Sequence, residues 1–138
     1  MANPAPFRKT YFTDHKDTYE AALMSLFSGA PEDTQTDLDK LFTPYFTQRD
    51  DETTRDFPAF VKHIQWLRTI LPKGSVKLTV TVFLRDGSQL AERHTSTSTR
   101  DDGSIIHAET FQFVEVAEDG RISSIVETVV KTPQPSEV

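Results

Sequence analysis

The sequence QLAERHTSTSTRDDGSIIHAETFQFVEV, from Gln89 to Val116, decides the fold because it holds two strand-like runs joined by an Asp-Gly pair. An Asp-Gly pair between alternating runs is a strong signal for a β-hairpin, since both turn residues tolerate positive φ. If Asp102 and Gly103 form a two-residue loop, the register places His94 opposite Phe111 and Ser96 opposite Glu109.

One face of this predicted hairpin mixes aromatic rings with an imidazole and carboxylates. Its members are Glu92, His94, Ser96, Glu109, Phe111 and Phe113. A face that only packs would carry Val, Ile and Leu throughout, so the mixture predicts the floor of a pocket. The opposite face includes Ile106, Ala108 and Val114 among threonines, and we expect it to be wet or only partly covered.

The chain after Gly74 is predicted to be entirely β. Asp-Gly pairs recur at 86–87, 102–103 and 119–120, and apolar residues alternate with polar ones from residue 76 onward. Three such turns predict a four-stranded antiparallel meander with strands at about 76–85, 88–100, 104–117 and 121–131. Strands of this length must twist and coil, so the sheet is expected to have a concave side.

Three helices are predicted before the sheet. Apolar residues recur at helical spacing in 14–28, a short helix is expected around 35–42, and Asp56 is placed to cap a third helix that ends before Pro72. A short strand is expected at 45–48 and a polar loop at 49–55. The result is one α+β domain over 14–131, with a loose arm at 1–13 and a disordered tail at 132–138.

Composition excludes several classes of function. The chain of 138 residues has no Cys, so it holds no disulfide and no zinc-thiolate site. A net charge of −6 without a basic cluster argues against a nucleic-acid partner. No apolar run is long enough to span a bilayer and the first residues lack the core of a signal peptide, so we expect no membrane partner and a cytoplasmic location.

Several motifs together resemble a known family. They are LFTPYFTQ, DFPAFVKHIQWLR, LAERHTST, AETFQFVEV and EDGRISSIVE, and they lie between residues 17 and 131. In this pattern the chain resembles the SnoaL-like branch of the nuclear-transport-factor-2 (NTF2) superfamily, which implies a cone-shaped barrel of three helices over a curved sheet. The superfamily includes polyketide cyclases, isomerases and dehydratases as well as non-catalytic modules. The resemblance makes Asp50 the nearest match to the carboxylate base of steroid isomerases. Ile106, Ala108 and Val114 make the predicted outer sheet face more apolar than a solvated face requires, and relatives commonly pair sheet to sheet, so we expect a homodimer through that face.

Five residues are candidates for proton transfer: His94, Glu109, Asp50, His63 and Glu127. His94 can act as an acid or a base near neutral pH, and Glu109 is expected to face the cavity and tune it. Glu127 lies on the last predicted strand, where the simple register puts it on the outer face unless a bulge turns it inward. For each candidate the alternative is a structural role as a hydrogen-bonded or helix-edge group.

A second set of residues is predicted to bind a small apolar organic ligand: Tyr19, Phe27, Tyr45, Gln48, Phe60, Trp66, Ser96, Phe111 and Phe113. Aromatic residues at helical spacing are also typical of a core. His94, His107 and Glu109 give no fixed ligand spacing, so we expect no metal and no other cofactor.

Two functions remain open at this point. One is a cofactor-independent cyclase, isomerase or dehydratase that acts on a polyketide- or terpenoid-like carbonyl compound. The other is a non-catalytic ligand-binding or dimerisation module. The position of His94 and Glu109 relative to one cavity discriminates between them.

Overall fold

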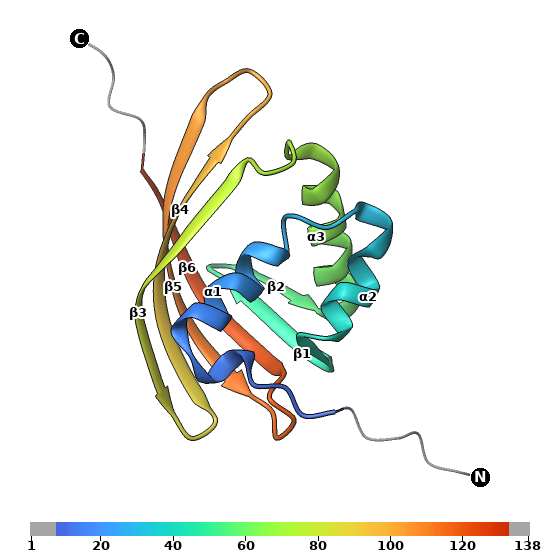
Figure 1. Ribbon diagram of the computed structural model, residues 1–138, viewed down its shortest axis with the longest axis vertical. Coiled ribbons are helices and arrows are strands. Elements are labelled where there is room, and N and C mark those ends of the chain that lie inside the picture. Colours follow the sequence, from blue (N-terminus) through green and yellow to red (C-terminus); the bar gives the residue numbers. More distant parts are fainter. Residues whose placement is uncertain (1–7, 133–138) are drawn as a thin grey trace.

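The computed structural model describes residues 8–132 and is built on an open six-stranded sheet (Figure 1). Its strands lie in the order β2-β1-β6-β5-β4-β3. Their bounds are β1 Phe42–Asp50, β2 Thr53–Asp56, β3 Val76–Asp86, β4 Gln89–Thr99, β5 Ile105–Val116 and β6 Ile122–Thr132. Strands β3 to β6 pair antiparallel in chain order, as expected from the Asp-Gly spacing.

The predicted four-stranded sheet is incomplete, because two strands from the first half of the chain extend it. Strand β1 pairs parallel with β6, and β2 pairs antiparallel with β1. The residues predicted as a polar loop at 49–55 are the hairpin between β1 and β2. Polar residues form this hairpin because only one of its faces is covered by the rest of the chain.

Three α-helices lie on the concave side of the curved sheet (Figure 1). They are α1 Lys16–Ser25, α2 Thr34–Asp39 and α3 Phe57–Ile70. Helix α3 begins where the sequence predicts, because the Asp56 side chain accepts a hydrogen bond from the Ala59 N–H. Residues 1–7 of the predicted arm and 133–138 of the predicted tail lie outside the described residues. Between residues 8 and 132, no helix is long and apolar enough to cross a membrane.

An aromatic cluster fixes α3 over β1. The ring of Phe60 on α3 packs against Phe42 and Phe46 of β1, with ring centroids 5.1 and 4.9 Å apart. All three side chains are buried. Edge-on and tilted ring pairs at this spacing add stability beyond the area that they bury. The space between α3 and the sheet is therefore closed at the β1 end.

The turn between β4 and β5 has three loop residues where the sequence predicted two. The Arg100 N–H donates to the Ser104 carbonyl at 2.8 Å, and the Gly103 N–H donates to the Arg100 carbonyl at 2.9 Å. Gly103 has a φ of +84°, which completes the common three-residue hairpin loop. The Asp102 side chain accepts from the Ser104 N–H at 2.8 Å and holds this loop closed.

This turn shifts the predicted register by one residue. His94 lies opposite Thr110, and Arg93 lies opposite Phe111. Because side chains alternate along a strand, a shift of one residue exchanges the two faces of β5. Phe111 and Phe113 are therefore on the outer face, 40% and 71% exposed, where the sequence predicted that they face inward.

Residues predicted for the outer face of β5 lie inward instead. Thr110, Gln112 and Val114 are buried, and Ala108 faces the interior with them. Strand β4 keeps the face that the sequence predicted, with Glu92 and His94 buried. Only the β5 half of the predicted pocket floor is therefore wrong.

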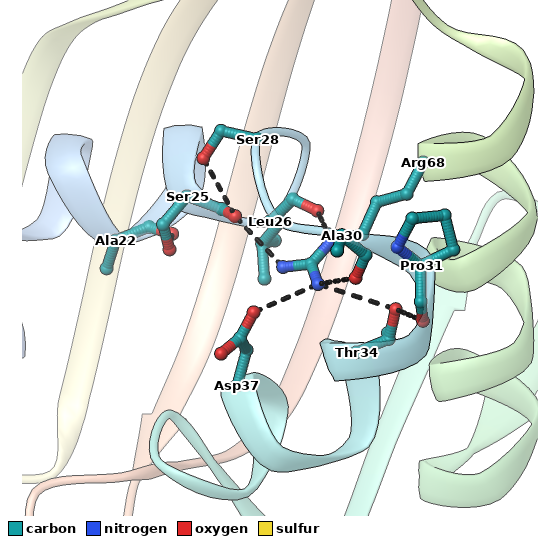
Figure 2. Close-up of polar contacts among 9 residues, drawn as sticks. All are labelled: Ala22, Ser25, Leu26, Ser28, Ala30, Pro31, Thr34, Asp37 and Arg68. Atoms are coloured by element: carbon teal, nitrogen blue, oxygen red, sulfur yellow. Dashed lines mark hydrogen bonds and ion pairs between the residues drawn. The ribbon is translucent and has the colours of Figure 1, made fainter. Parts of the chain in front are cut away.

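Arg68 of α3 holds the three helices together (Figure 2). Its guanidinium donates to the carbonyls of Leu26, Ala30 and Ser25 at 2.8, 3.0 and 3.1 Å. It also forms an ion pair with Asp37 of α2 at 3.0 Å, and its side chain is 1% exposed. A guanidinium is suited to this position because its planar fork offers five donors to acceptors in one plane.

Arg68→Leu is expected to lower the free energy of unfolding by about 3 kcal/mol, because several buried acceptors lose a charged donor. Urea denaturation followed by circular dichroism measures the loss. Thr69→Ala is the control, since the exposed Thr69 hydroxyl bonds only within its own helix, and it should change stability by less than about 0.5 kcal/mol. Equal stability of Arg68→Leu and the wild type would contradict the assigned role.

Candidate functional site

A cavity of about 260 Å³ lies between the concave sheet face and helices α1 and α3. Its apolar wall includes Leu23, Leu26, Phe27, Phe60, Ile64 and Ile125. Its polar residues come mainly from the sheet, which also contributes Val76, Leu78, Ala108, Ile125 and Val129, so the helix side is mainly apolar and the sheet side is mixed.

Eight of the residues predicted for the site line this cavity: Phe27, Gln48, Asp50, Phe60, His63, His94, Ser96 and Glu127. Tyr19 does not line it, but its hydroxyl is hydrogen-bonded to the cavity residue Gln112. Tyr45 and Trp66 are 69% and 53% exposed, and Trp66 stacks on His63 outside the cavity. Their large rings are therefore not part of the ligand-binding wall.

Glu109, Phe111 and Phe113 do not reach the cavity, and their predicted inward position is wrong. Glu109 forms an ion pair with Arg93 on the outer face of the sheet. Arg93 also lies over the ring of Phe111. All three follow from the one-residue shift at the β4–β5 turn, which turns the odd-numbered residues of β5 outward.

Glu127 faces the cavity, contrary to the prediction from the simple register. Its partner on β5 is Gln112, so both side chains point to the same side of the sheet. The prediction placed Gln112 on the outer face because of the error at the β4–β5 turn. It placed Glu127 on the same face because the two residues are partners. The β5–β6 turn also has one more loop residue than predicted, since the Ala117 N–H donates to the Arg121 carbonyl at 2.8 Å, and a register shift between Glu115 and Val116 offsets it. Glu127 therefore stays opposite Gln112 and points inward with it.

Four side chains form a polar row across the sheet. Glu92, Gln112, Glu127 and Asp50 are successive partners on β4, β5, β6 and β1. Neighbouring strands are about 4.8 Å apart, so the row spans roughly 14 Å. His94 stands two residues beyond Glu92 on the same face of β4.

His94 is held by a buried carboxyl group. Its Nδ1 lies 2.7 Å from Oε1 of Glu92, and the Glu92 side chain is completely buried. The other carboxyl oxygen of Glu92 has no hydrogen-bond partner. The sequence predicted that Glu109 tunes His94, and the structure assigns that position to Glu92.

Burial raises the pKa of Glu92, against the opposing effects of the hydrogen bond and charge of His94, and the Glu127 charge raises it further. A desolvated pair favours the form with no net charge. In that form one proton lies between Oε1 of Glu92 and Nδ1 of His94, bonded to either atom. Nε2 of His94 carries a second hydrogen. His94 then presents a hydrogen-bond donor to the cavity.

Two amides hold Glu127 as an acceptor. The side-chain nitrogen of Gln48 donates to Oε1 of Glu127 at 2.6 Å, and that of Gln112 donates to Oε2 at 2.8 Å. Each carboxyl oxygen of Glu127 therefore accepts a hydrogen bond from an amide whose nitrogen points toward it. Glu127 also lines the cavity, where it can accept a proton from a ligand.

The orientation of both amides is fixed by groups that donate to their oxygens. Arg55, which has no acceptor, donates to Oε1 of Gln48 at 3.1 Å. The Tyr19 hydroxyl donates to Oε1 of Gln112 at 2.7 Å. Burial raises the pKa of Tyr19 well above its usual value, and the charges of Glu92 and Glu127 raise it further, so the phenol keeps its proton.

Asp50 and His63 complete the polar side of the cavity. Asp50 pairs with Arg55 at 3.0 Å, so its charge is largely compensated. Burial and the charge of Arg55 lower the pKa of His63, while Asp50 opposes this effect. His63 is therefore a neutral imidazole near neutral pH, able to donate from one nitrogen and accept at the other.

Sequence reasoning did not assign roles to Gln112, Arg55 or Glu92. The spacing of Glu92 and His94, two residues apart on one strand, was a usable signal because such residues share a face. Gln112 could not be found while the register was wrong. Among residues 8–132, no three His, Cys, Asp or Glu side chains gather as the ligands of a metal ion would.

Comparison with solved structures identifies the fold. A proposed isomerase of the SnoaL-like family from Agrobacterium tumefaciens superposes with a TM-score of 0.64, covering 83% of this chain and 97% of its own, at 13% identity. The chain has the NTF2-like fold. No family model and no curated protein sequence matches it.

Two further structures show how wide this NTF2-like group is. A proposed SnoaL-like polyketide cyclase from a Jannaschia species has a TM-score of 0.58, covers 93% of this chain and 91% of its own, and is 10% identical. An NTF2-like protein of unknown function from an Exiguobacterium species has a TM-score of 0.63, covers 81% and 98%, and is 16% identical. Likeness at this level establishes the NTF2-like fold and leaves the reaction to the residues of the cavity.

The raised pKa of Glu92 predicts how stability depends on pH. The native state holds the Glu92 proton more tightly than the unfolded chain, where the pKa is near 4.5. The stabilisation is complete below that pH and is lost as pH rises through the higher native pKa. Relative to Glu92→Gln, the wild type should therefore lose unfolding free energy as pH rises above 4.5.

Urea denaturation of both proteins between pH 4 and pH 8 measures this difference. In a His94→Asn background the loss should be larger, because the imidazole that favours the carboxylate is gone. An identical pH dependence for wild type and Glu92→Gln would show that Glu92 is ionised as easily in the native state as in the unfolded chain.

Proposed function

We propose that this protein is a cofactor-independent acid–base enzyme that acts on a small, uncharged carbonyl compound. The observation that carries the proposal is the pairing of a donor and an acceptor in one cavity. His94, backed by Glu92, offers a proton, and Glu127, held by two amides, accepts one. Such opposed groups suit the formation of an enol.

In the proposed reaction Glu127 removes a proton from the carbon next to the carbonyl group, while Nε2–H of His94 donates to the carbonyl oxygen. The electron pair of the broken C–H bond forms the C=C bond of the enol, while the π pair of the carbonyl group moves to its oxygen, which takes the proton from Nε2. Glu127 then holds the proton removed from carbon. Returning it to another carbon gives an isomer, attack of the enol carbon on a second carbonyl closes a ring, and its transfer to a departing β-hydroxyl releases water and gives a dehydration product. The oriented donor stabilises negative charge developing on the oxygen.

The spacing of the two groups fits a compact substrate. His94 lies on β4 and Glu127 on β6, separated by one strand and by an offset of two residues along the sheet, so their backbones are roughly 12 Å apart. Both side chains point into the cavity, which leaves room for one ring between them. The apolar side chains of α1 and α3 would cover that ring and exclude water, which strengthens both interactions.

The absence of basic residues from the cavity wall supports an uncharged substrate. No Lys or Arg is among the described residues that line it, whereas Asp50 and Glu127 are. A carboxylate or phosphate ligand would meet negative charge in a desolvated site, which is costly. Small polyketide- or terpenoid-like ketones are uncharged and compact enough for the volume of the cavity.

A panel of monocyclic β,γ-unsaturated ketones, β-hydroxy ketones and 1,3-diketones tests the reaction, with proton–deuterium exchange at carbon followed by NMR. His94→Ala and Glu127→Gln should each lower the rate at least about a hundredfold, the usual cost of losing a general acid or base. Glu109→Gln is the matched control: the same change on the outer face of the sheet should leave the rate unaltered.

The alternative is a binding module without catalysis, for which the same donor and acceptor would only orient the ligand. Compounds that bind without exchange, or variants that exchange as fast as the wild type while keeping the fold by circular dichroism, would favour this alternative. Asp50 and His63 remain candidates for a second proton carrier, because both line the cavity beside Glu127.

We also propose that two copies pair through the outer sheet face. Leu84, Ala91, Phe113 and Val126 are successive partners across β3, β4, β5 and β6, and they form an apolar row on that face. A hollow of about 460 Å³ lies over this row. Leu84 and Phe113 are 63% and 71% exposed. Contiguous exposed apolar residues of this kind mark association surfaces.

The residues that first suggested this homodimer are not the ones that support it. Ala108 and Val114 were predicted on the outer face, and both lie inward. The outer positions of β5 are held by Phe111 and Phe113 instead, which makes the outer face more apolar than predicted. The proposed surface is therefore the same, with different side chains.

Sedimentation equilibrium at micromolar concentration should give twice the 15.6 kDa of one chain. Phe113→Asp is expected to weaken association at least a hundredfold, because it places a charge at the centre of the apolar row. Tyr45→Asp, an equally exposed aromatic on β1 outside that row, should leave association unchanged. A monomeric wild type would refute the proposal.

A further inference from the structure

A groove on the surface adjoins the cavity and shares two wall residues with it. The groove has a volume of about 400 Å³ and lies between the end of α1 and the start of β3. Phe27 and Val76 line both spaces. Ala21, Met24, Gly74 and Lys77 line the groove alone. Phe27 and Val76 therefore form a partition one side chain thick between the cavity and the groove.

The backbone that carries Phe27 is held firmly. Phe27 lies just after α1, and its N–H donates to the Met24 carbonyl at 3.1 Å. Before Phe27 the carbonyls of Ser25 and Leu26, and after it the carbonyl of Ala30, accept hydrogen bonds from the buried guanidinium of Arg68 (Figure 2). Because Arg68 of α3 fixes this backbone, the Phe27 part of the partition can move only through its side chain.

We propose that Phe27 determines the length of ligand that the cavity accepts. With the phenyl ring of Phe27 in place, the cavity binds a carbonyl compound of about one ring and leaves no space for an alkyl chain attached to it. Without the ring, the cavity and the groove join, and an unbranched alkyl chain can pass over Met24. This inference rests on the proposed ligand site and narrows its substrate class to compact ketones without a long tail.

The chemistry of the groove decides which tail would enter it. Its lining includes the apolar side chains of Ala21 and Met24, with Glu20 and Lys77 as one acidic and one basic residue. Burying one methylene contributes about 0.8 kcal/mol, which corresponds to about fourfold in affinity. A saturated chain in the joined space should therefore gain about fourfold for each carbon until it leaves the groove.

The experiment uses cyclohexanone and its 4-n-alkyl derivatives from methyl to hexyl, with dissociation constants from NMR titration of the whole protein. The wild type is expected to bind the ring and to gain less than twofold from methyl to hexyl. Phe27→Ala is expected to bind the ring within threefold of the wild type and to gain about fourfold per added methylene over at least three carbons.

Two further variants keep the result interpretable. Val76→Ala thins the same partition and should show a weaker gain with chain length, which serves if Phe27→Ala does not fold. Met24→Ala is the matched control, since Met24 lines the groove and not the cavity. Alone it should behave as the wild type, and combined with Phe27→Ala it should reduce the gain per methylene.

The outcomes separate this inference from the proposed function. A wild type that already gains with chain length, or a folded Phe27→Ala that does not, overturns the role of Phe27 and leaves the acid–base proposal standing. If cyclohexanone does not bind the wild type at all, the cavity is not the ligand site and both proposals fall. Because only binding is measured, the result does not depend on whether the bound ketone reacts.

Discussion

The loop that joins β4 to β5 is closed by the Asp102 side chain, which accepts a hydrogen bond from the Ser104 N–H, and by Gly103 at a φ of +84°. Three loop residues rather than two place Thr110 opposite His94. Every inward residue of β5 depends on that choice, and through Gln112 so does the inward position of Glu127 on β6. The length of one solvent-exposed turn and the composition of the cavity are therefore linked.

Within the cavity, the proposed chemistry depends on side chains that act as hydrogen-bond donors to the two amides. Arg55 can donate but not accept, so it fixes the amide of Gln48 with its nitrogen toward Glu127. Tyr19 keeps its proton because it is buried, and it fixes Gln112 in the same sense. Together these contacts define Glu127 as an acceptor before any ligand arrives, which is the preorganisation that electrostatic catalysis requires.

On the helix side of the cavity, the buried guanidinium of Arg68 holds the helices in place. Arg68 ties the end of α1 to α2 and α3, and by doing so it fixes the backbone that carries Phe27. A structural ion pair and a residue proposed to limit ligand length are therefore neighbours in the fold. Stability and specificity at this end of the cavity are expected to change together when Arg68 is altered.

The amino-acid sequence by itself determined the elements of this protein: helix α3 begins at its Asp56 cap, and the strands after Gly74 follow their alternation and their Asp-Gly turns. These features depend on local backbone preferences and on hydrophobic period, which a sequence displays directly. The same dipeptide, however, takes different places in the turns: after β3, where Asp86 pairs with Gln89, the two loop residues are Gly87 and Ser88, whereas after β4 both Asp102 and Gly103 belong to a three-residue loop. Loop length is decided by which register buries the better face, and that comparison involves the whole sheet and the helices over it. For this reason the sequence could not show that Glu92, and not Glu109, lies beside His94, or that Glu127 lines the cavity. Only the tertiary structure decided both.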